Sequence, residues 1–309
     1  MRRGCADIGR PHAFDQDRRV SLTHIAFIVL SALLHATYNL LMRRAHGERA
    51  FLVRMFVVAS VISLTCAAVV DGTSSIVWGN TPVVVATSAG YVSHQILVAK
   101  AYERGSISAL YPLTMLSPML VPVWGLAFLG ERISAVTAGG IGATLCGAFL
   151  VKMRALSQQE LIRVWNLRGQ SAGAGYAVAA SLVYSIGAAL DKSRVASFPL
   201  MTYIAPLIST MTVLAIGYLY AVERRPLGLM RREDLLSALA GGAIVTLSFL
   251  SFRVALREVA VSLAVSVRQT SIVFAIALGA GLLHERLAAG KLVGSLVLIL
   301  GVIVIGAGR

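Results

Sequence analysis

The feature that most constrains this chain is a series of long apolar segments that recurs from one end of the sequence to the other. A membrane-spanning helix needs about 20 predominantly apolar residues, and ten segments of about that length qualify. They are residues 22–42, 50–70, 82–103, 107–129, 135–152, 172–190, 200–222, 235–257, 261–283 and 288–307. Because a backbone in lipid must satisfy its own hydrogen bonds, the sequence predicts an all-α integral membrane protein with ten transmembrane helices.

Composition agrees with this prediction and excludes a soluble domain. Hydrophobic residues make up 57% of the 309 residues and charged residues only 14%, whereas soluble domains carry roughly a quarter charged residues. The net charge of +14 would suit nucleic-acid binding only if it gathered on one face. The basic residues instead flank the apolar segments, as Arg43 and Arg44 do, so we predict no nucleic-acid partner.

The two halves of the chain are related by an internal repeat. When the sequence is shifted by 154 residues, the pair Glu131 and Arg132 falls on Glu285 and Arg286. Further identities flank this pair without a gap: Ala101 on Ala255, Ser108 on Ser262, Ser117 on Ser271, Gly125 on Gly279, Ala135 on Ala289, Gly140 on Gly294 and Gly147 on Gly301. A charged pair in register with these matches indicates duplication rather than shared apolar composition.

This repeat divides the chain into a polar N-terminal tail (1–20), a first five-helix repeat (21–152), a basic linker (153–171) and a second five-helix repeat (172–309). Five is an odd number, so the second repeat must enter the membrane from the opposite face. We therefore predict two inverted five-helix repeats. This architecture builds a site near the midplane and permits alternating access.

Small residues predict where helices approach closely. Gly139, Ala143 and Gly147 recur every fourth residue in one apolar segment. Such a stripe is typical of helix packing in lipid. We therefore expect this face to contact a neighbouring helix.

Arg268 is the charged residue predicted to lie deepest in a span, beside Gln269 and Ser271. An arginine there cannot shed its proton, so it must face protein, water or a ligand. Two interpretations stay open: it snorkels or binds carbonyls and hydroxyls, or it receives an anionic group such as a substrate carboxylate.

Other polar residues inside the predicted spans are candidates for the same site. They are His35, Asn39, His94 and Gln95, with Tyr111 and Tyr184 as amphipathic walls. Each histidine fits either an interhelical hydrogen bond or the lining of a cavity. With Arg268, Gln269 and Ser271 they form the predicted substrate-binding set.

The acidic residues are predicted to lie at span ends or outside the bilayer. Asp191 and Glu131 are placed at span ends, where Glu131 would satisfy backbone or basic groups. Arg253 is placed near enough to an end to snorkel. The sequence thus predicts no carboxylate near the centre of a span, where proton-coupled transporters usually carry one.

Short motifs carry a resemblance to a known family. They are the segments HATYNLLMR at 35–43, AYERG at 101–105, LGER at 129–132, Asp191 with Lys192, VRQTSIVF at 267–274, and HER at 284–286. At these residues the chain resembles the EamA-type transporters of the drug/metabolite transporter superfamily. The resemblance implies ten helices as an inverted repeat around a central cavity, and transport of small metabolites such as amino acids. One position departs from repeat symmetry, because Val259 stands where the first half has Gly105.

We therefore expect a secondary transporter in the cell (inner) membrane that moves small organic metabolites, amino-acid-like or carboxylate-bearing, by alternating access. A non-transporting scaffold or sensor and a membrane-embedded enzyme are the alternatives; an enzyme would need a convergent catalytic set, which the sequence does not show. The expected partners are a small-molecule substrate and the lipid bilayer, with a homodimer left open. Neither a metal nor a cofactor is predicted. The orientation stays open: basic loops favour termini outside, and the resemblance favours termini inside.

Overall fold

The computed structural model describes residues 21–44, 49–72, 81–105, 110, 113–151, 171–224, 227, 232–283 and 289–308. Across these ranges the regular structure is helical, as predicted. The predicted N-terminal tail, nearly all of the basic linker, Tyr111 and Glu285 lie outside the described residues.

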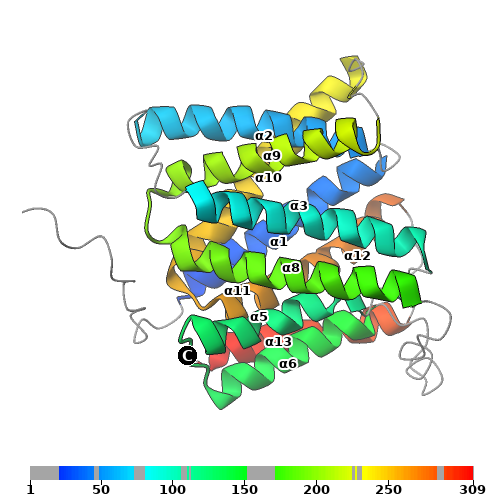
Figure 1. Ribbon diagram of the computed structural model, residues 1–309. Coiled ribbons are helices and arrows are strands. Elements are labelled where there is room, and N and C mark those ends of the chain that lie inside the picture. The colour runs from blue at the N-terminus through cyan, green and yellow to red at the C-terminus, as the bar shows by residue number, and fades with distance from the viewer. Residues whose placement is uncertain are drawn as a thin grey trace, which may run out of the picture.

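The helices pack side by side, several in roughly the same direction and others crossing them obliquely (Figure 1). The first half contributes α1 (Leu22–Arg44), α2 (Arg49–Val70), α3 (Thr81–Glu103), α5 (Leu116–Phe128) and α6 (Ala135–Leu150). The second half contributes α8 (Ser171–Val195), α9 (Leu200–Ala221), α10 (Arg232–Glu258), α11 (Val261–Arg268), α12 (Thr270–Leu283) and α13 (Ala289–Ala307). Within the described part of the chain, eight candidate spans are long and apolar enough to cross a membrane, with α11 and α12 counted as one; α5 and α6 are shorter apolar helices.

The predicted segment 261–283 is interrupted at Gln269, which separates α11 from α12. The N–H of Gln269 bonds to the carbonyl of Ser266 at 3.0 Å, three residues back rather than four, so the helix tightens there. In the first half, Met115 immediately precedes α5. Met115 lies 154 residues before Gln269, so the irregularity falls at the same register position in both halves.

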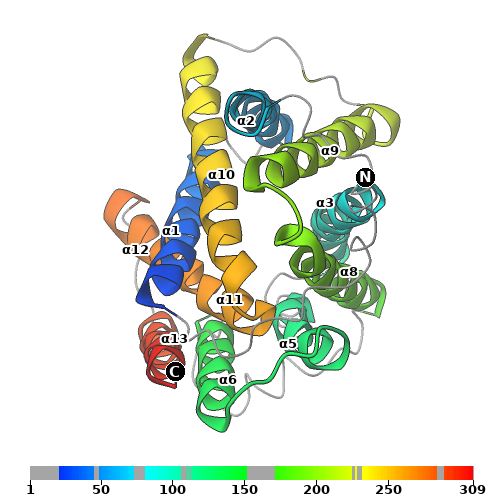
Figure 2. The same ribbon diagram turned by 90° about the vertical axis from the view of Figure 1, so that its left-hand side faces the viewer.

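Helices from the two halves pack in reciprocal pairs. The closest pairs are α6 with α13, α3 with α8, α1 with α10, and α2 with α9. Figure 2 looks along most of the helices and shows α6 beside α13 and α3 beside α8. The repeat relates α1 to α8, α2 to α9, α3 to α10 and α6 to α13. The α3–α8 pair is therefore the repeat equivalent of the α1–α10 pair, and α2–α9 and α6–α13 each join a helix to its own counterpart.

The α6–α13 contact depends on glycine. A Cβ on Gly147 would lie 2.3 Å from the backbone nitrogen of Leu298 and 2.7 Å from the carbonyl of Gly294. A Cβ on Gly140 would lie 2.9 Å from the carbonyl of Gly301. As numbers rise along α6 they fall along α13, so the helices are antiparallel. Gly147 thus meets Gly294, which is the repeat counterpart of Gly140. Gly140 in turn meets Gly301, the repeat counterpart of Gly147.

The predicted stripe is therefore correct at Gly147 and wrong at Gly139, beside which a Cβ would meet nothing within 4 Å. The face that packs is one residue further along, at Gly140, Thr144 and Gly147, all of them buried. The spacing of small residues alone fitted both registers.

Candidate functional site

Arg268 is the last residue of α11, at the interruption described above. It is half-buried, and its guanidinium carbon lies 4.4 Å from the ring centre of Phe252. It forms no ion pair with a described acidic residue. α11 packs against α1, which carries His35 and Tyr38, and against α8, which carries Tyr184. Arg268 is thus a cation inside a span, stacked on an aromatic ring and carried by a helix whose neighbours bear polar and aromatic side chains.

On α1, the side chains of His35, Tyr38 and Asn39 are held by local bonds. The Tyr38 hydroxyl lies 2.6 Å from Nδ1 of His35, and the two rings meet edge to face at 4.9 Å. The amide nitrogen of Asn39 donates to the carbonyl of His35 at 2.9 Å. This bond fixes Asn39 on the same stretch of α1.

A second group of rings lies between α3 and α8. The centres of Tyr91 and Tyr184 are 5.6 Å apart, and those of His94 and Tyr184 are 5.0 Å apart. His94 Nδ1 donates to the carbonyl of Ala180 at 3.0 Å, because a carbonyl can only accept. His94 therefore makes an interhelical bond and also stacks in the cluster.

The predicted set is brought together in part. The helix that carries Arg268 packs against the helices that carry His35 and Tyr184, and the His94 ring lies against the Tyr184 ring. Of the remaining members, Asn39 is held on α1, the Gln269 amide donates to Val265 of its own helix at 3.4 Å, Ser271 is half-buried on α12, Gln95 is exposed, and Tyr111 lies outside the described residues.

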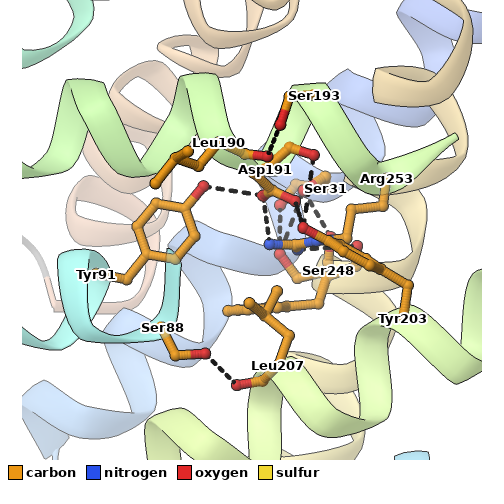
Figure 3. Close-up of polar contacts among 11 residues, drawn as sticks. Ser31, Ser88, Tyr91, Leu190, Asp191, Ser193, Tyr203, Leu207, Ser248 and Arg253 are labelled. Carbon is orange, nitrogen blue, oxygen red and sulfur yellow. Dashed lines mark hydrogen bonds and ion pairs between the residues drawn. The ribbon is translucent and has the colours of Figure 1, made fainter. Parts of the chain in front are cut away.

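Sequence reasoning missed a buried ion pair. Asp191 Oδ2 lies 2.7 Å from Nη2 of Arg253, and the two side chains are 0% and 2% exposed (Figure 3). Arg253 was predicted to snorkel, and this was wrong. Asp191 was predicted at a span end, but α8 continues to Val195 because both charged residues at its predicted end have buried partners.

Two tyrosines complete the bonding of this carboxylate. Tyr91 donates to Oδ2 of Asp191 and Tyr203 donates to Oδ1, each at 2.9 Å. Arg253 also packs over Phe249 at 4.7 Å, while its Nε is buried without a partner. No residue spacing in the sequence reports this network, because its members come from α3, α8, α9 and α10.

Close to this pair, α1 and α10 are joined by a reciprocal serine bond (Figure 3). The Ser31 hydroxyl donates to the carbonyl of Ser248 at 2.8 Å, and the Ser248 hydroxyl donates to the carbonyl of Ser31 at 3.0 Å. Both side chains are fully buried. These bonds fix α10, which carries Arg253, against the first half.

The turn between α10 and α11 is held by opposite charges. Glu131 Oε2 accepts from the Ser262 hydroxyl at 2.5 Å, and Oε1 accepts from the N–H of Val261 at 2.5 Å. Lys192 donates to the carbonyl of Leu256 at 2.8 Å. A carboxylate at a helix N-terminus and a cation at a helix C-terminus both complement the helix dipole. Glu131 thus satisfies backbone groups, as predicted.

Apolar helices of spanning length that enclose charged and aromatic side chains define a multi-pass membrane protein. A model of the EamA-like transporter family matches residues 22–153 and 171–307, one copy in each half. The chain belongs to this family, within the drug/metabolite transporter superfamily. The two matches confirm the internal repeat.

One solved structure shares the fold across nearly all of both chains. It is titled "Crystal structure of protein", and it superimposes with a TM-score of 0.74 at 15% identity. The match covers 92% of this chain and 97% of the other. No curated protein sequence matches the chain.

Proposed function

We propose that the protein is a secondary transporter of small carboxylate-bearing organic solutes, amino acids among them, which it moves across the inner membrane by alternating access. The observation that carries this proposal is Arg268, a half-buried cation inside a span that has no described acidic partner. The helices packed against α11 carry hydrogen-bonding side chains, His35 on α1 and Tyr184 on α8.

The chemistry of arginine favours a carboxylate as the anion. A guanidinium presents donors in a planar fork that matches the two oxygens of a carboxylate. Arg268 lies in the last turn of α11, where the helix dipole is negative and stabilises a cation while the site is empty. Its guanidinium carbon lies 4.4 Å from the Phe252 ring centre, and a cation over a ring face keeps its N–H donors along its edge.

Alternating access rests on ten helices arranged as two inverted repeats. The reciprocal helix pairs and the antiparallel α6–α13 contact support this arrangement, since counterpart helices meet in opposite directions. The site then lies between the halves: α1 and α3 contribute His35 and His94, and α8 and α11 contribute Tyr184 and Arg268. Rocking one half against the other would expose these residues to either side in turn.

Uptake and efflux in proteoliposomes test this function. The protein is reconstituted and offered a panel of labelled carboxylates, including amino acids, together with the matched primary amides. We expect transport of at least one carboxylate and none of its amide, because only the carboxylate meets the charge of Arg268. Equal transport of acid and amide would refute the anionic-substrate proposal, and no transport of either would refute this solute class.

A further inference from the structure

Tyr91 and Tyr203 bind the same carboxylate but have different surroundings. Both hydroxyls donate to Asp191 at 2.9 Å. Tyr203 is fully buried in the apolar core on α9. Tyr91 is half-buried on α3, and its ring packs against Tyr184. Of these two tyrosines, Tyr91 is therefore the one that connects the ion pair to the ring cluster formed by Tyr184 and His94.

We propose that Tyr91 is a positioning residue of the substrate site: the Asp191–Arg253 pair fixes its hydroxyl, and its ring fixes Tyr184 against His94, both of which belong to the predicted substrate-binding set. This inference rests on the proposed function, in that Arg268 receives the solute. It also assigns a role to the buried Asp191–Arg253 pair, which forms no hydrogen bond with any described residue predicted to bind substrate.

The geometry favours a rigid connection. Asp191 Oδ2 is anchored by Arg253 at 2.7 Å, and it accepts from Tyr91 on the other side. Hydrogen bonds to a charged acceptor are roughly twice as strong as neutral ones. Tyr91 is therefore held at its hydroxyl by Asp191 and at its ring by Tyr184.

The close approach of α3 and α8 also confines the Tyr91 ring. A Cβ on Gly90 would lie 3.4 Å from the Cα of Gly187, so α3 and α8 nearly touch beside Tyr91. A Cβ on Gly187 would lie 3.7 Å from Cε1 of Tyr91. Since Tyr91 belongs to the first half and Asp191 and Tyr184 to the second, the contact also sets the two halves relative to each other at the site.

Energetics argue against stability as the sole purpose of the pair. Desolvating two charges costs several kcal/mol for each ion, and apolar replacements of such pairs are often neutral or stabilising. Here Arg253 also leaves its Nε buried and unbonded. An arrangement with this cost is better explained by the placement that it imposes on Tyr91.

The test compares Tyr91→Phe with Tyr203→Phe, since each removes one hydroxyl from the same carboxylate and keeps its ring. Full-length protein in detergent carries 3-fluorotyrosine at position 184, and ¹⁹F NMR reports the environment of that ring without any solute. Benzoate is then titrated as the probe, because it is a small molecule that pairs a carboxylate with an aromatic ring.

We expect Tyr91→Phe to shift or broaden the ¹⁹F signal of the empty protein, and Tyr203→Phe to leave it unchanged. In the titration we expect Tyr91→Phe to raise the Kd for benzoate about fivefold, which corresponds to about 1 kcal/mol. Tyr203→Phe should change this Kd less than about twofold. Thermal unfolding of both variants checks that each remains folded.

The outcomes separate the two proposals. If both variants leave the ¹⁹F signal of the empty protein unchanged, or both alter it equally, Tyr91 has no special positioning role. If wild-type protein shows no response to benzoate while Tyr91→Phe alone perturbs the signal, the positioning role stands and binding of this carboxylate probe at the site is refuted. A normal Kd in Tyr91→Phe despite a changed signal also overturns the inference, because the position of Tyr184 would then not matter for binding.

Discussion

Glu131 and Ser262 lie 131 residues apart in the sequence, yet the carboxylate of one accepts the hydroxyl of the other at 2.5 Å. This contact places a negative charge at the first turn of α11, whose last residue is Arg268. Each charge complements the end of the helix dipole at which it lies. The contact also joins the two repeats, so the short helix that presents Arg268 is held from the first half of the chain.

Substituting Glu131→Gln should destabilise the protein with little effect on the choice of solute. The amide keeps one acceptor oxygen but loses the charge that faces Val261 and Ser262, at a cost of about 1–3 kcal/mol. A lower thermal midpoint in detergent would show this. Glu103→Gln is the matched control, because Glu103 is exposed. A stable Glu131→Gln variant with altered solute preference would contradict a structural role.

Substituting Gly147→Ala should weaken the α6–α13 contact, because the new Cβ would overlap backbone atoms of Leu298 and Gly294. Backbone cannot move aside as a flexible side chain can, so we expect a loss of about 1–3 kcal/mol. Gly139→Ala on the same helix meets nothing within 4 Å and should be neutral. Comparing the thermal midpoints of the two variants tests the packing register, and equal midpoints would refute it.

The sequence predicted the helical class and the internal repeat because both depend on patterns along the chain. Segments such as 200–222 were placed within a residue or two, since α9 spans Leu200–Ala221. The end of α8 was misplaced because Asp191 and Lys192 resemble an interfacial boundary. Both are in fact buried with partners on α10, and no local signal reports a partner more than 60 residues away.

The candidate site was predicted less completely for the same reason. Arg268 was identifiable as a charge inside an apolar segment. His35 and Tyr184 were identifiable as polar side chains inside other predicted spans. Gln95 adjoins His94 in sequence but is exposed, because successive helical residues point in different directions. Tyr91 was not in the predicted substrate-binding set, because its bond to Asp191 joins two residues that are 100 positions apart in the sequence.

Breaking the Asp191–Arg253 pair from one side should cost more than removing both charges. Asp191→Ala leaves a buried guanidinium uncompensated, so we expect a loss of about 3–5 kcal/mol. The double variant Asp191→Leu with Arg253→Met should recover most of that stability, because apolar groups fill similar space. The cycle is completed by thermal unfolding of the single variants Asp191→Leu and Arg253→Met beside the double variant that combines them. Additive losses would mean that the pair is not coupled.

Reporter fusions before residue 1 and after Arg309 should give the same side of the membrane. Two five-helix repeats make an even total of crossings, whichever way the first helix inserts. A cytoplasm-active and a periplasm-active reporter at each end measure this directly. Opposite sides would mean an odd number of crossings, and the inverted-repeat proposal would fail.

Variants of Arg268 test the proposed anion site most directly. Arg268→Lys keeps the charge but loses the planar fork, so uptake of a carboxylate substrate should fall partially, about tenfold. Arg268→Ala removes the charge, and uptake should be largely abolished, by about a hundredfold or more. Arg104→Ala is the control, because Arg104 is exposed and its guanidinium packs over Tyr176, outside the site. No described acidic residue pairs with Arg268, so its removal uncovers no buried carboxylate and the variant should stay folded. A folded Arg268→Ala protein that transports carboxylates at the wild-type rate would reduce Arg268 to a structural residue, and the anionic-substrate proposal would fall with it.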